Sequence, residues 1–371
     1  MQRSPITWLI IIALVVLPNL LLNDTPLTQP LHASSGFALR LFGTGPTDRD
    51  RVKIPLGVIS NGALTSSFPV NVDTDFTIEF WMRAEAANNP SDPCGSGNAG
   101  WYYGTILVDR DIFGDDAGDY GIALRDGRII FGVNNGTNET NLCGNIPVTT
   151  GQWRHIAVTR NASSGLMRIF VDGQLDTQEN GPTGGIAFPV GRSAHSEYPD
   201  DPYLVLGAEK HDYPGSRYYN GLLDDLRISN LVRYEASFTR PTAPHAADNN
   251  TVALYRFNEG AGTQINDSSG AAGGPSHGQL IPRNSSNVAE HWSAETPPFS
   301  ADSEPSPSPS PSPSPSPSPS PSPSPSPEPS PSPSPSPSPS PSPSPSPSPS
   351  PEPSPSPEPS PSPEPSPSPE P

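Results

Sequence analysis

Acidic side chains gather in two loop-like stretches of the sequence. The first is DRDIFGDDAGD at residues 109–119, and the second is LGAEKHD at residues 206–212. Ca²⁺ is bound in proteins by about six to eight oxygen atoms from carboxylates, amide side chains and backbone carbonyls. We therefore predict a calcium site with four ligands, although two solvated acidic loops would explain the same pattern. The predicted ligands are Asp109, Asp111, Glu209 and Asp212.

Aromatic side chains cluster close to both acidic stretches. WYY occupies residues 101–103, and a second group spans residues 213–219. An exposed ring offers an apolar face on which a sugar can stack. We predict a carbohydrate-binding platform on these loops, and the alternative is that the rings cover the edges of the fold. The predicted ligand-binding residues are Trp101, Tyr103, Tyr213 and Tyr218.

The sequence lacks the patterns expected of an enzyme. Retaining glycoside hydrolysis needs two carboxyl groups about 5–5.5 Å apart, which residues i and i+2 of a strand could supply. Asp109 and Asp111 have this spacing but run into a loop, and the adjacent Asp224 and Asp225 are expected to face opposite ways. Gly-x-Ser-x-Gly, HExxH and phosphate-loop motifs are absent. We predict a non-catalytic binding protein, and the alternatives are a glycoside hydrolase or lyase of the same fold, or a purely structural extracellular module.

The chain contains two cysteines, Cys94 and Cys143. A disulfide between them is expected if the protein is exported, because oxidising compartments preserve such bonds. On the chain-entropy account, closing a loop of about 50 residues stabilises the fold by about 4 kcal/mol. Free thiols or metal ligation are the alternatives.

The first 33 residues are typical of an export signal. Arg3 precedes an apolar run at residues 6–22, and LHA at residues 31–33 offers a cleavage site after Ala33. We predict cleavage, a secreted or cell-surface protein, and no membrane insertion afterwards. An uncleaved anchor is the alternative, because the run is near the lower length limit for a membrane span.

Residues 301–371 form a separate region of alternating proline and serine. From Ser303 onward it has no apolar side chains to bury in a core, so we predict a disordered tail that acts as a spacer or stalk. The whole chain has a formal net charge of −18. That charge argues against nucleic acid as a partner, because phosphates are bound by basic side chains.

Residues 34–300 read as one all-β domain. Several segments alternate apolar and polar residues with a period of two, as half-buried strands do, and none shows a sustained helical period. Asp126-Gly127 and Asp172-Gly173 predict tight hairpin turns. The predicted strands lie at residues 37–42, 51–56, 76–83, 105–109, 120–124, 128–133, 153–160, 166–171, 203–207, 221–228 and 251–257.

Seven segments of this domain resemble the LamG-like branch of the concanavalin A-like jelly rolls, in family order. They are FTIEFWMRAE, GDYGIALRDGRIIFGV, GQWRHIAVTRN, GLMRIFVDGQL, YLVLGAEKHD, YNGLLDDLRISNLVRY and TVALYRFNEGAGTQINDSSG. The resemblance implies a jelly-roll β-sandwich that binds a glycan or a surface protein outside the cell. It retains His155 of the family's WHH triplet, which we expect to be a hydrogen-bonded structural residue, and it has Asn258 where the family usually has Asp. Pentraxins, which share the sandwich, place calcium ligands in a stretch similar to LGAEKHD, where Glu209 matches their Glu and His211 falls on their Asp.

Overall fold

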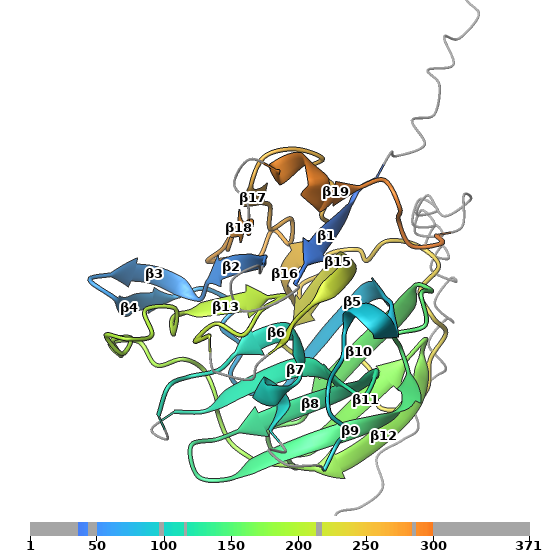
Figure 1. The fold of residues 1–371 in the computed structure, drawn as a ribbon. Helices are drawn as coiled ribbons and strands as arrows, with labels where there is room; N and C mark the ends of the chain where they lie inside the picture. Colours follow the sequence, from blue (N-terminus) through green and yellow to red (C-terminus); the bar gives the residue numbers. More distant parts are fainter. Residues whose placement is uncertain are drawn as a thin grey trace, which may run out of the picture. The chain divides into compact units, whose positions relative to one another are not determined.

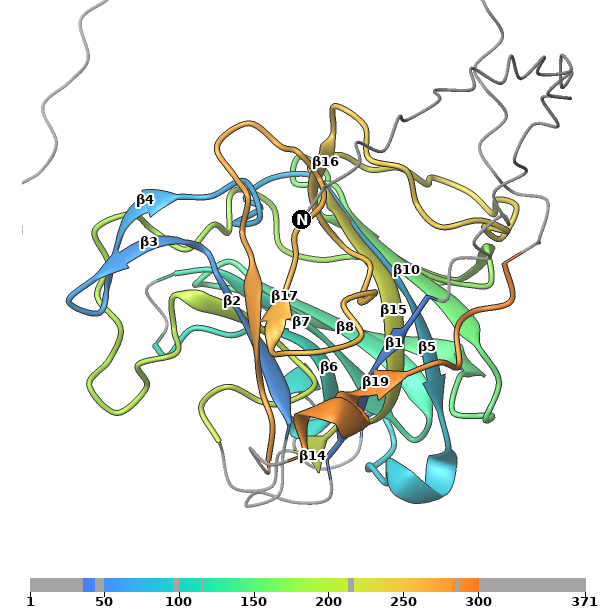
Figure 2. The ribbon, with the colours of Figure 1, turned by 90° about the horizontal axis from the view of Figure 1, so that it is seen from above.

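The computed structural model describes residues 36–43, 50–95, 100–114, 117–212, 217–283 and 287–299. These residues form a sandwich of two large sheets with three short 3₁₀ segments (Figures 1 and 2). The predicted all-β jelly roll is confirmed. The predicted signal peptide and the predicted Pro-Ser tail lie outside the described residues.

The first sheet has eight antiparallel strands, and β16 (Thr251–Tyr255) joins it by pairing with β15. In spatial order its other strands are β12 (Gln174–Asn180), β11 (Leu166–Val171), β10 (Arg154–Arg160), β5 (Phe76–Ala84), β15 (Asn220–Ser229), β1 (Ala38–Phe42) and β19 (Trp292–Ser293).

The second sheet has nine strands, and β14 (Arg217–Tyr218) joins it by a parallel pairing with β6. A separate hairpin of β3 (Gly57–Ser60) and β4 (Ala63–Ser67) projects from the sandwich (Figures 1 and 2). In spatial order the remaining strands of the second sheet are β17 (Gln264–Ile265), β18 (Gly278–Ile281), β2 (Arg51–Pro55), β13 (Tyr203–Leu206), β6 (Thr105–Arg110), β7 (Asp119–Arg125), β8 (Arg128–Asn134) and β9 (Glu139–Pro147).

The core lies between the sheets and follows the period-two pattern. Phe76 on β5 meets Tyr120 on β7 and Phe131 on β8, with ring centroids 5.0 and 6.1 Å apart. Alternate residues of these strands continue the apolar layer, because successive side chains of a strand point to opposite faces. The other face of β7 and β8 therefore points away from the core.

Asp-Gly pairs close two of the hairpins as predicted. Asp126 and Gly127 have φ angles of 48° and 70°, and Asp172 and Gly173 have φ angles of 51° and 79°. Positive φ at both central residues defines the turn whose twist matches that of the flanking strands. The β3–β4 hairpin uses Asn61 and Gly62 in the same way, with φ angles of 51° and 77°.

The outer face of the eight-stranded sheet is covered by residues 230–250. Thr77 donates a hydrogen bond to the carbonyl of Leu231, and Arg227 donates one to the carbonyl of Ala246. This cover explains why Glu79 and His155, on the face opposite to the core, are fully buried. Within the described residues, no helix is long and apolar enough to cross a membrane.

Candidate functional site

A polar cleft opens at one end of the nine-stranded sheet, on the face turned away from the core. At this end β6 and β8 finish and β7 and β9 begin, because neighbouring strands run antiparallel. Asp119, Asn134 and Glu139 are cross-strand neighbours there, so their side chains form a row. The Asn134 amide donates a 3.3 Å hydrogen bond to Asp119, which joins two members of the row.

Trp101 fixes the loop that forms one wall of the cleft. It begins the 3₁₀ segment η2 (Trp101–Tyr103), and its ring lies on the cross-strand pair Gly121 and Gly132. A Cβ on Gly121 would lie only 2.1 Å from the indole, so the two glycines create the space that the ring fills. Trp101 is fully buried. The prediction that it belongs to an exposed platform is therefore wrong.

Tyr102 and Tyr103 face the cleft that Trp101 supports. Both rings are partly exposed, and their centroids lie 4.8 Å apart. The cleft has a volume of about 330 Å³. Its lining residues are Tyr102, Tyr103, Asp111, Ile112, Gly114, Asp119, Asn134 and Glu139. Tyr103 and Asp111, two of the residues predicted from the sequence, therefore lie in one cleft.

The cleft is acidic, and among its described lining residues none carries a positive charge. Burial, reinforced by the nearby Asp111 carboxylate, raises the pKa of Asp119 to about 8. Burial also raises the pKa of Tyr102 to about 12. At neutral pH the cleft therefore presents a phenol and a carboxylic acid as hydrogen-bond donors beside the exposed carboxylate of Glu139.

Asp111 belongs to both the cleft and a buried charge cluster behind it. Its Oδ2 lies 3.1 Å from Nδ1 of His211, and Nε2 of the same ring lies 2.8 Å from Asp201. Burial alone would lower the pKa of His211, but the hydrogen bonds that the ring donates to Asp111 and Asp201 outweigh it and raise this pKa to about 9. His211 is therefore an imidazolium held between two carboxylates.

The same cluster contains Asp109 and Glu209. Asp109 is fully buried, and its two oxygens accept backbone N–H groups of Asp111 and Lys210 at 2.7 and 2.8 Å. Burial raises the pKa of Asp109 to about 6. Glu209 accepts the backbone N–H of His211 at 2.9 Å. These contacts hold the chain after β13 against the end of β6.

The four predicted calcium ligands do not all point to one place. Asp111 and Glu209 share a group with His211 in which the ligand atoms lie within 4.8 Å of one another. Asp212 instead accepts a 2.6 Å hydrogen bond from Arg51. In this group His211 offers a ring nitrogen where Ca²⁺ prefers an oxygen ligand.

The second predicted aromatic group does not form a platform in the described structure. Tyr218 is only 4% exposed on β14, packed beside Gly43. The prediction that Tyr218 binds a ligand is therefore wrong, because its ring is buried. Tyr213 lies outside the described residues, as do Asp115 and Asp116 of the first acidic stretch.

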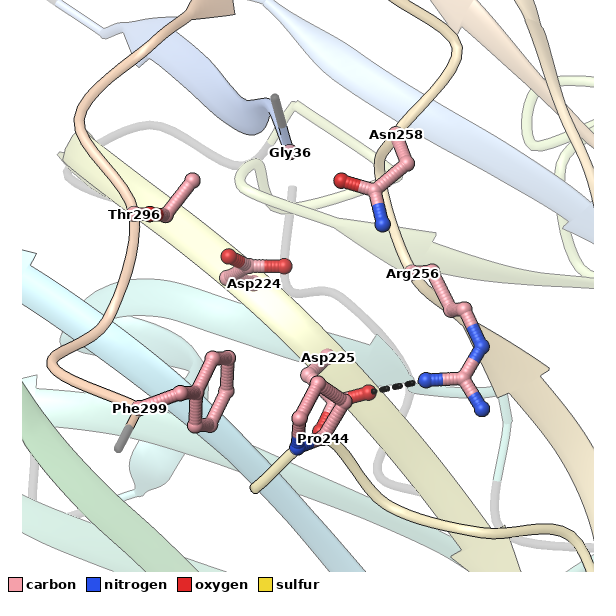
Figure 3. Close-up of a pocket in the computed structure, with 8 residues that line it drawn as sticks. All are labelled: Gly36, Asp224, Asp225, Pro244, Arg256, Asn258, Thr296 and Phe299. Carbon is pink, nitrogen blue, oxygen red and sulfur yellow. Dashed lines mark hydrogen bonds and ion pairs between the residues drawn. The ribbon is translucent and has the colours of Figure 1, made fainter. Parts of the chain in front are cut away.

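A second, smaller pocket of about 50 Å³ lies beside β15 (Figure 3). Asp224 and Asp225 both line it, together with Arg256 and Asn258. The expectation that these two carboxylates face opposite ways is wrong, because β15 bulges at this point and Asp225 adopts a left-handed φ of 48°. Burial raises the pKa of Asp224 to about 8 and that of Asp225 to about 6.

Cys94 and Cys143 form a disulfide, which confirms the predicted pairing. Cys143 lies on β9, and Cys94 lies in the loop that leads to η2. Both cysteines pack against the small apolar cluster around Trp101. The bond therefore anchors the tyrosine-bearing loop to the strand that carries Glu139.

Sequence reasoning did not single out Asn134 and Glu139. Each stands at a strand end, where a polar residue carries little information of its own. Asp119 lies on the same face of β7 as Gly121. Once the cross-strand register was known, the position of Asp119 would have identified Asn134 and Glu139 as its neighbours on that face.

Comparisons with known proteins agree with this architecture. Residues 57–237 match the Laminin_G_3 family model, described as the concanavalin A-like lectin/glucanases superfamily. No curated protein shows significant sequence similarity to the chain.

Several solved structures are similar to the chain. A candidate carbohydrate-binding protein from Bacteroides ovatus is 15% identical with a TM-score of 0.42. The match covers 66% of this chain and 58% of that protein. Mouse laminin α1 domains LG4-5 are 12% identical with a TM-score of 0.34, covering 62% of this chain and 52% of that chain. The CBM40 domain of a Ruminococcus gnavus sialidase, bound to α2,3-sialyllactose, is 12% identical with a TM-score of 0.31. The match covers 50% of this chain and 93% of that domain.

The chain spans less than two thirds of the first of these structures. The family match runs from β3 to the loop after β15 and includes every strand that borders the cleft. Residues 57–237 therefore belong to the concanavalin A-like lectin/glucanase superfamily.

Proposed function

We propose that the protein is a non-catalytic module that binds a neutral or amino-substituted glycan in the cleft between η2 and the ends of β7, β8 and β9. The observation that carries this proposal is the pairing of two adjacent, partly exposed tyrosines with a row of polar side chains. Sugars present apolar C–H faces and many hydroxyl groups, so a site for them needs both features.

The charge of the cleft indicates which glycans it accepts. Asp111, Glu139 and the protonated Asp119 can exchange hydrogen bonds with hydroxyl or amino groups. A uronic or sialic acid would bring a further negative charge beside them without a cation among the lining residues. Like charges at close range are unfavourable. We therefore expect neutral or amino sugars to bind more tightly than acidic ones.

A glycan array followed by calorimetry on the full chain tests the proposal. Tyr103→Ala and Glu139→Gln should each weaken binding by at least about tenfold, the effect of one lost stacking or charge-assisted contact. Tyr203→Ala is the matched control, because Tyr203 is a partly exposed tyrosine on β13 outside the cleft lining. Binding that survives both cleft substitutions would place the ligand elsewhere and overturn the proposal.

Glycan hydrolysis is a second candidate function because of Asp119. A carboxyl group with its pKa raised to about 8 beside a second carboxyl group is suited to general acid catalysis. Cleavage of a bound polysaccharide that Asp119→Asn abolishes would establish this activity. Binding without any turnover supports the non-catalytic module instead.

Calcium dependence and an extracellular location complete the proposal. The Cys94–Cys143 disulfide supports work in an oxidising compartment, where a glycan or a surface protein would be the partner. Calcium ligation by Asp109, Asp111, Glu209 and Asp212 remains a prediction from the sequence. Repeating the calorimetry with calcium and with a chelator tests it, and unchanged affinity and melting temperature would exclude it.

A further inference from the structure

A second group of buried, metal-ligating side chains lies on the eight-stranded sheet, outside the cleft. It joins Glu79 on β5, His155 on β10 and His245 in the covering segment of residues 230–250. The first two side chains are fully buried, and His245 is 5% exposed. One ligand atom from each lies within 4.8 Å of the others.

The spacing of these atoms suits a small tetrahedral ion. Nε2 of His155 lies 3.4 Å from Oε2 of Glu79, and Nε2 of His245 lies 3.6 Å from the same oxygen. Bonds of about 2.0–2.1 Å to a tetrahedral zinc ion place neighbouring ligand atoms about 3.3–3.4 Å apart. Small movements of the side chains would therefore place all three atoms around one ion.

The imidazole nitrogens lack short hydrogen bonds within the described protein. Both ring nitrogens of His155 and Nε2 of His245 are buried and make no hydrogen bond. The nearest polar contact of His155 is Oε2 of Glu79 at 3.4 Å, longer than a normal hydrogen bond. Buried polar atoms are almost always satisfied, so the unsatisfied Nε2 atoms of His155 and His245, which lie 3.4 and 3.6 Å from one carboxylate oxygen, call for a group that the chain itself does not supply.

Surrounding residues hold the three side chains in place. Arg227 donates two hydrogen bonds to Oε1 of Glu79, at 2.9 and 2.7 Å, which leaves Oε2 directed at the imidazoles. The hydroxyl of Tyr234 donates to Oε2 at 2.9 Å, and the backbone N–H of His245 donates to Asp225 at 2.6 Å. Such outer contacts orient ligands at metal sites.

We propose that Glu79, His155 and His245 form a buried binding site for a divalent transition metal of the zinc class. Two imidazoles and one carboxylate are a ligand set that zinc accepts with a fourth position open. Calcium and magnesium favour sites built from oxygen, so the two imidazoles select against them. The positive charge of Arg227 is balanced by Glu79, and Asp225 and Asp248 lie near Arg256 and Arg233 in the same region.

The small pocket beside β15 offers the ion a route to this site. Asp225 lines that pocket (Figure 3). Its Oδ2 lies 3.9 Å from Nε2 of His245. Pro244, the neighbour of His245 in the chain, lines the same pocket. Asp225 is thus placed to receive a cation from the pocket and to pass it to the buried ligands.

Metal titration of the full chain without a polyhistidine tag tests this site. We expect one Co²⁺ per chain with the intense visible absorption of a tetrahedral complex, and Zn²⁺ should displace it. His245→Gln should weaken Co²⁺ binding by at least about tenfold. Losing a side chain that only supports a metal ligand already costs about 10–100-fold in affinity, and losing a ligand should cost no less. His291→Gln is the matched control, because His291 is a buried histidine whose Nδ1 is hydrogen-bonded to the Arg40 carbonyl.

Two further measurements keep the result decisive. His211→Gln removes the imidazole of the other possible metal group, and it should leave Co²⁺ binding unchanged. In the unsubstituted chain, bound Co²⁺ should quench the fluorescence of Trp81, whose ring centroid lies 5.4 Å from that of His155, and Trp81→Phe should remove most of the quenching. This readout decides the question even if His245→Gln fails to fold.

Three outcomes would overturn the proposal. They are absence of stoichiometric Co²⁺ or Zn²⁺ binding by the folded chain, loss of binding in a His211→Gln variant that circular dichroism shows to be folded, and quenching that persists in Trp81→Phe. Co²⁺ binding and quenching are measured without glycan, so failure of this proposal is distinguishable from failure of glycan binding in the cleft, which lies on the other sheet.

Discussion

The indole of Trp101 occupies the position that a side chain on Gly132 would take. A Cβ built on Gly132 would lie 1.9 Å from Cδ1 of the ring, far inside van der Waals contact. Replacement of Gly132 by alanine should therefore displace Trp101 or the strand beneath it. Overpacking of this kind costs about 1–3 kcal/mol of unfolding free energy, which urea denaturation can measure.

The same substitution should also weaken glycan binding, because Tyr102 and Tyr103 follow Trp101 in η2. Gly184→Ala is a suitable control, since no atom lies within 4 Å of a Cβ at that glycine, although its φ of 89° will carry a cost of its own. Normal binding by Gly132→Ala would show that the tyrosines do not depend on the buried ring.

Loss of the disulfide should lower the stability of the protein. In the double variant Cys94→Ser and Cys143→Ser, the closed loop of 49 residues opens, and the unfolding free energy should fall by about 4 kcal/mol on the chain-entropy account. Thermal unfolding of the two proteins measures the effect. Equal melting temperatures would mean that the contacts around Trp101 alone hold the loop.

His211 should be essential to the stability of the acidic cluster. His211→Gln removes the cation between Asp111 and Asp201, and breaking a buried ion pair costs about 3–5 kcal/mol. Urea denaturation at neutral pH measures the loss, with the exposed His195→Gln as control.

The pH dependence of this contribution has a defined sign. The pKa of His211 is raised from 6.5 to about 9 in the folded protein, so its stabilising effect is complete below about pH 6.5 and is lost as the pH rises through about 9. An NMR titration that finds the folded pKa at or below 6.5 would contradict the proposed imidazolium.

Asp224 should make the protein less stable at alkaline pH. Burial raises its pKa from 3.8 to about 8, so the folded state holds a proton that the unfolded state releases. Unfolding free energy should therefore decrease as the pH rises from about 4 to about 8. Asp224→Asn should remove this component and stabilise the protein more at about pH 8 than at about pH 5, whereas Asp126→Asn at an exposed turn should not.

The sequence was most informative where local chemistry decides the structure. The Asp126-Gly127 and Asp172-Gly173 turns, and the alternation along β5, β7, β8 and β10, were all predicted, because turn type and side-chain period depend on neighbouring residues. Asn61-Gly62 carries the same turn signal and was overlooked.

The site depends on contacts between distant segments, and prediction was weaker there. Whether Trp101 is a platform or a buried anchor depends on glycines of two other strands. The direction of Asp225 depends on a bulge set by the pairing of β15 with β5. His245 comes to Glu79 only because residues 230–250 fold back over the sheet.

Because Trp101 is buried, the side chain that holds η2 in place is not one of those that line the cleft. The residues that keep η2 in place face inward, whereas Tyr102, Tyr103 and Glu139 line the cleft in which we propose that the glycan binds. A ligand meets a surface that is already ordered, so little conformational entropy is lost on binding. Changes at these three outward positions could therefore redirect specificity during evolution, and the fold would tolerate them.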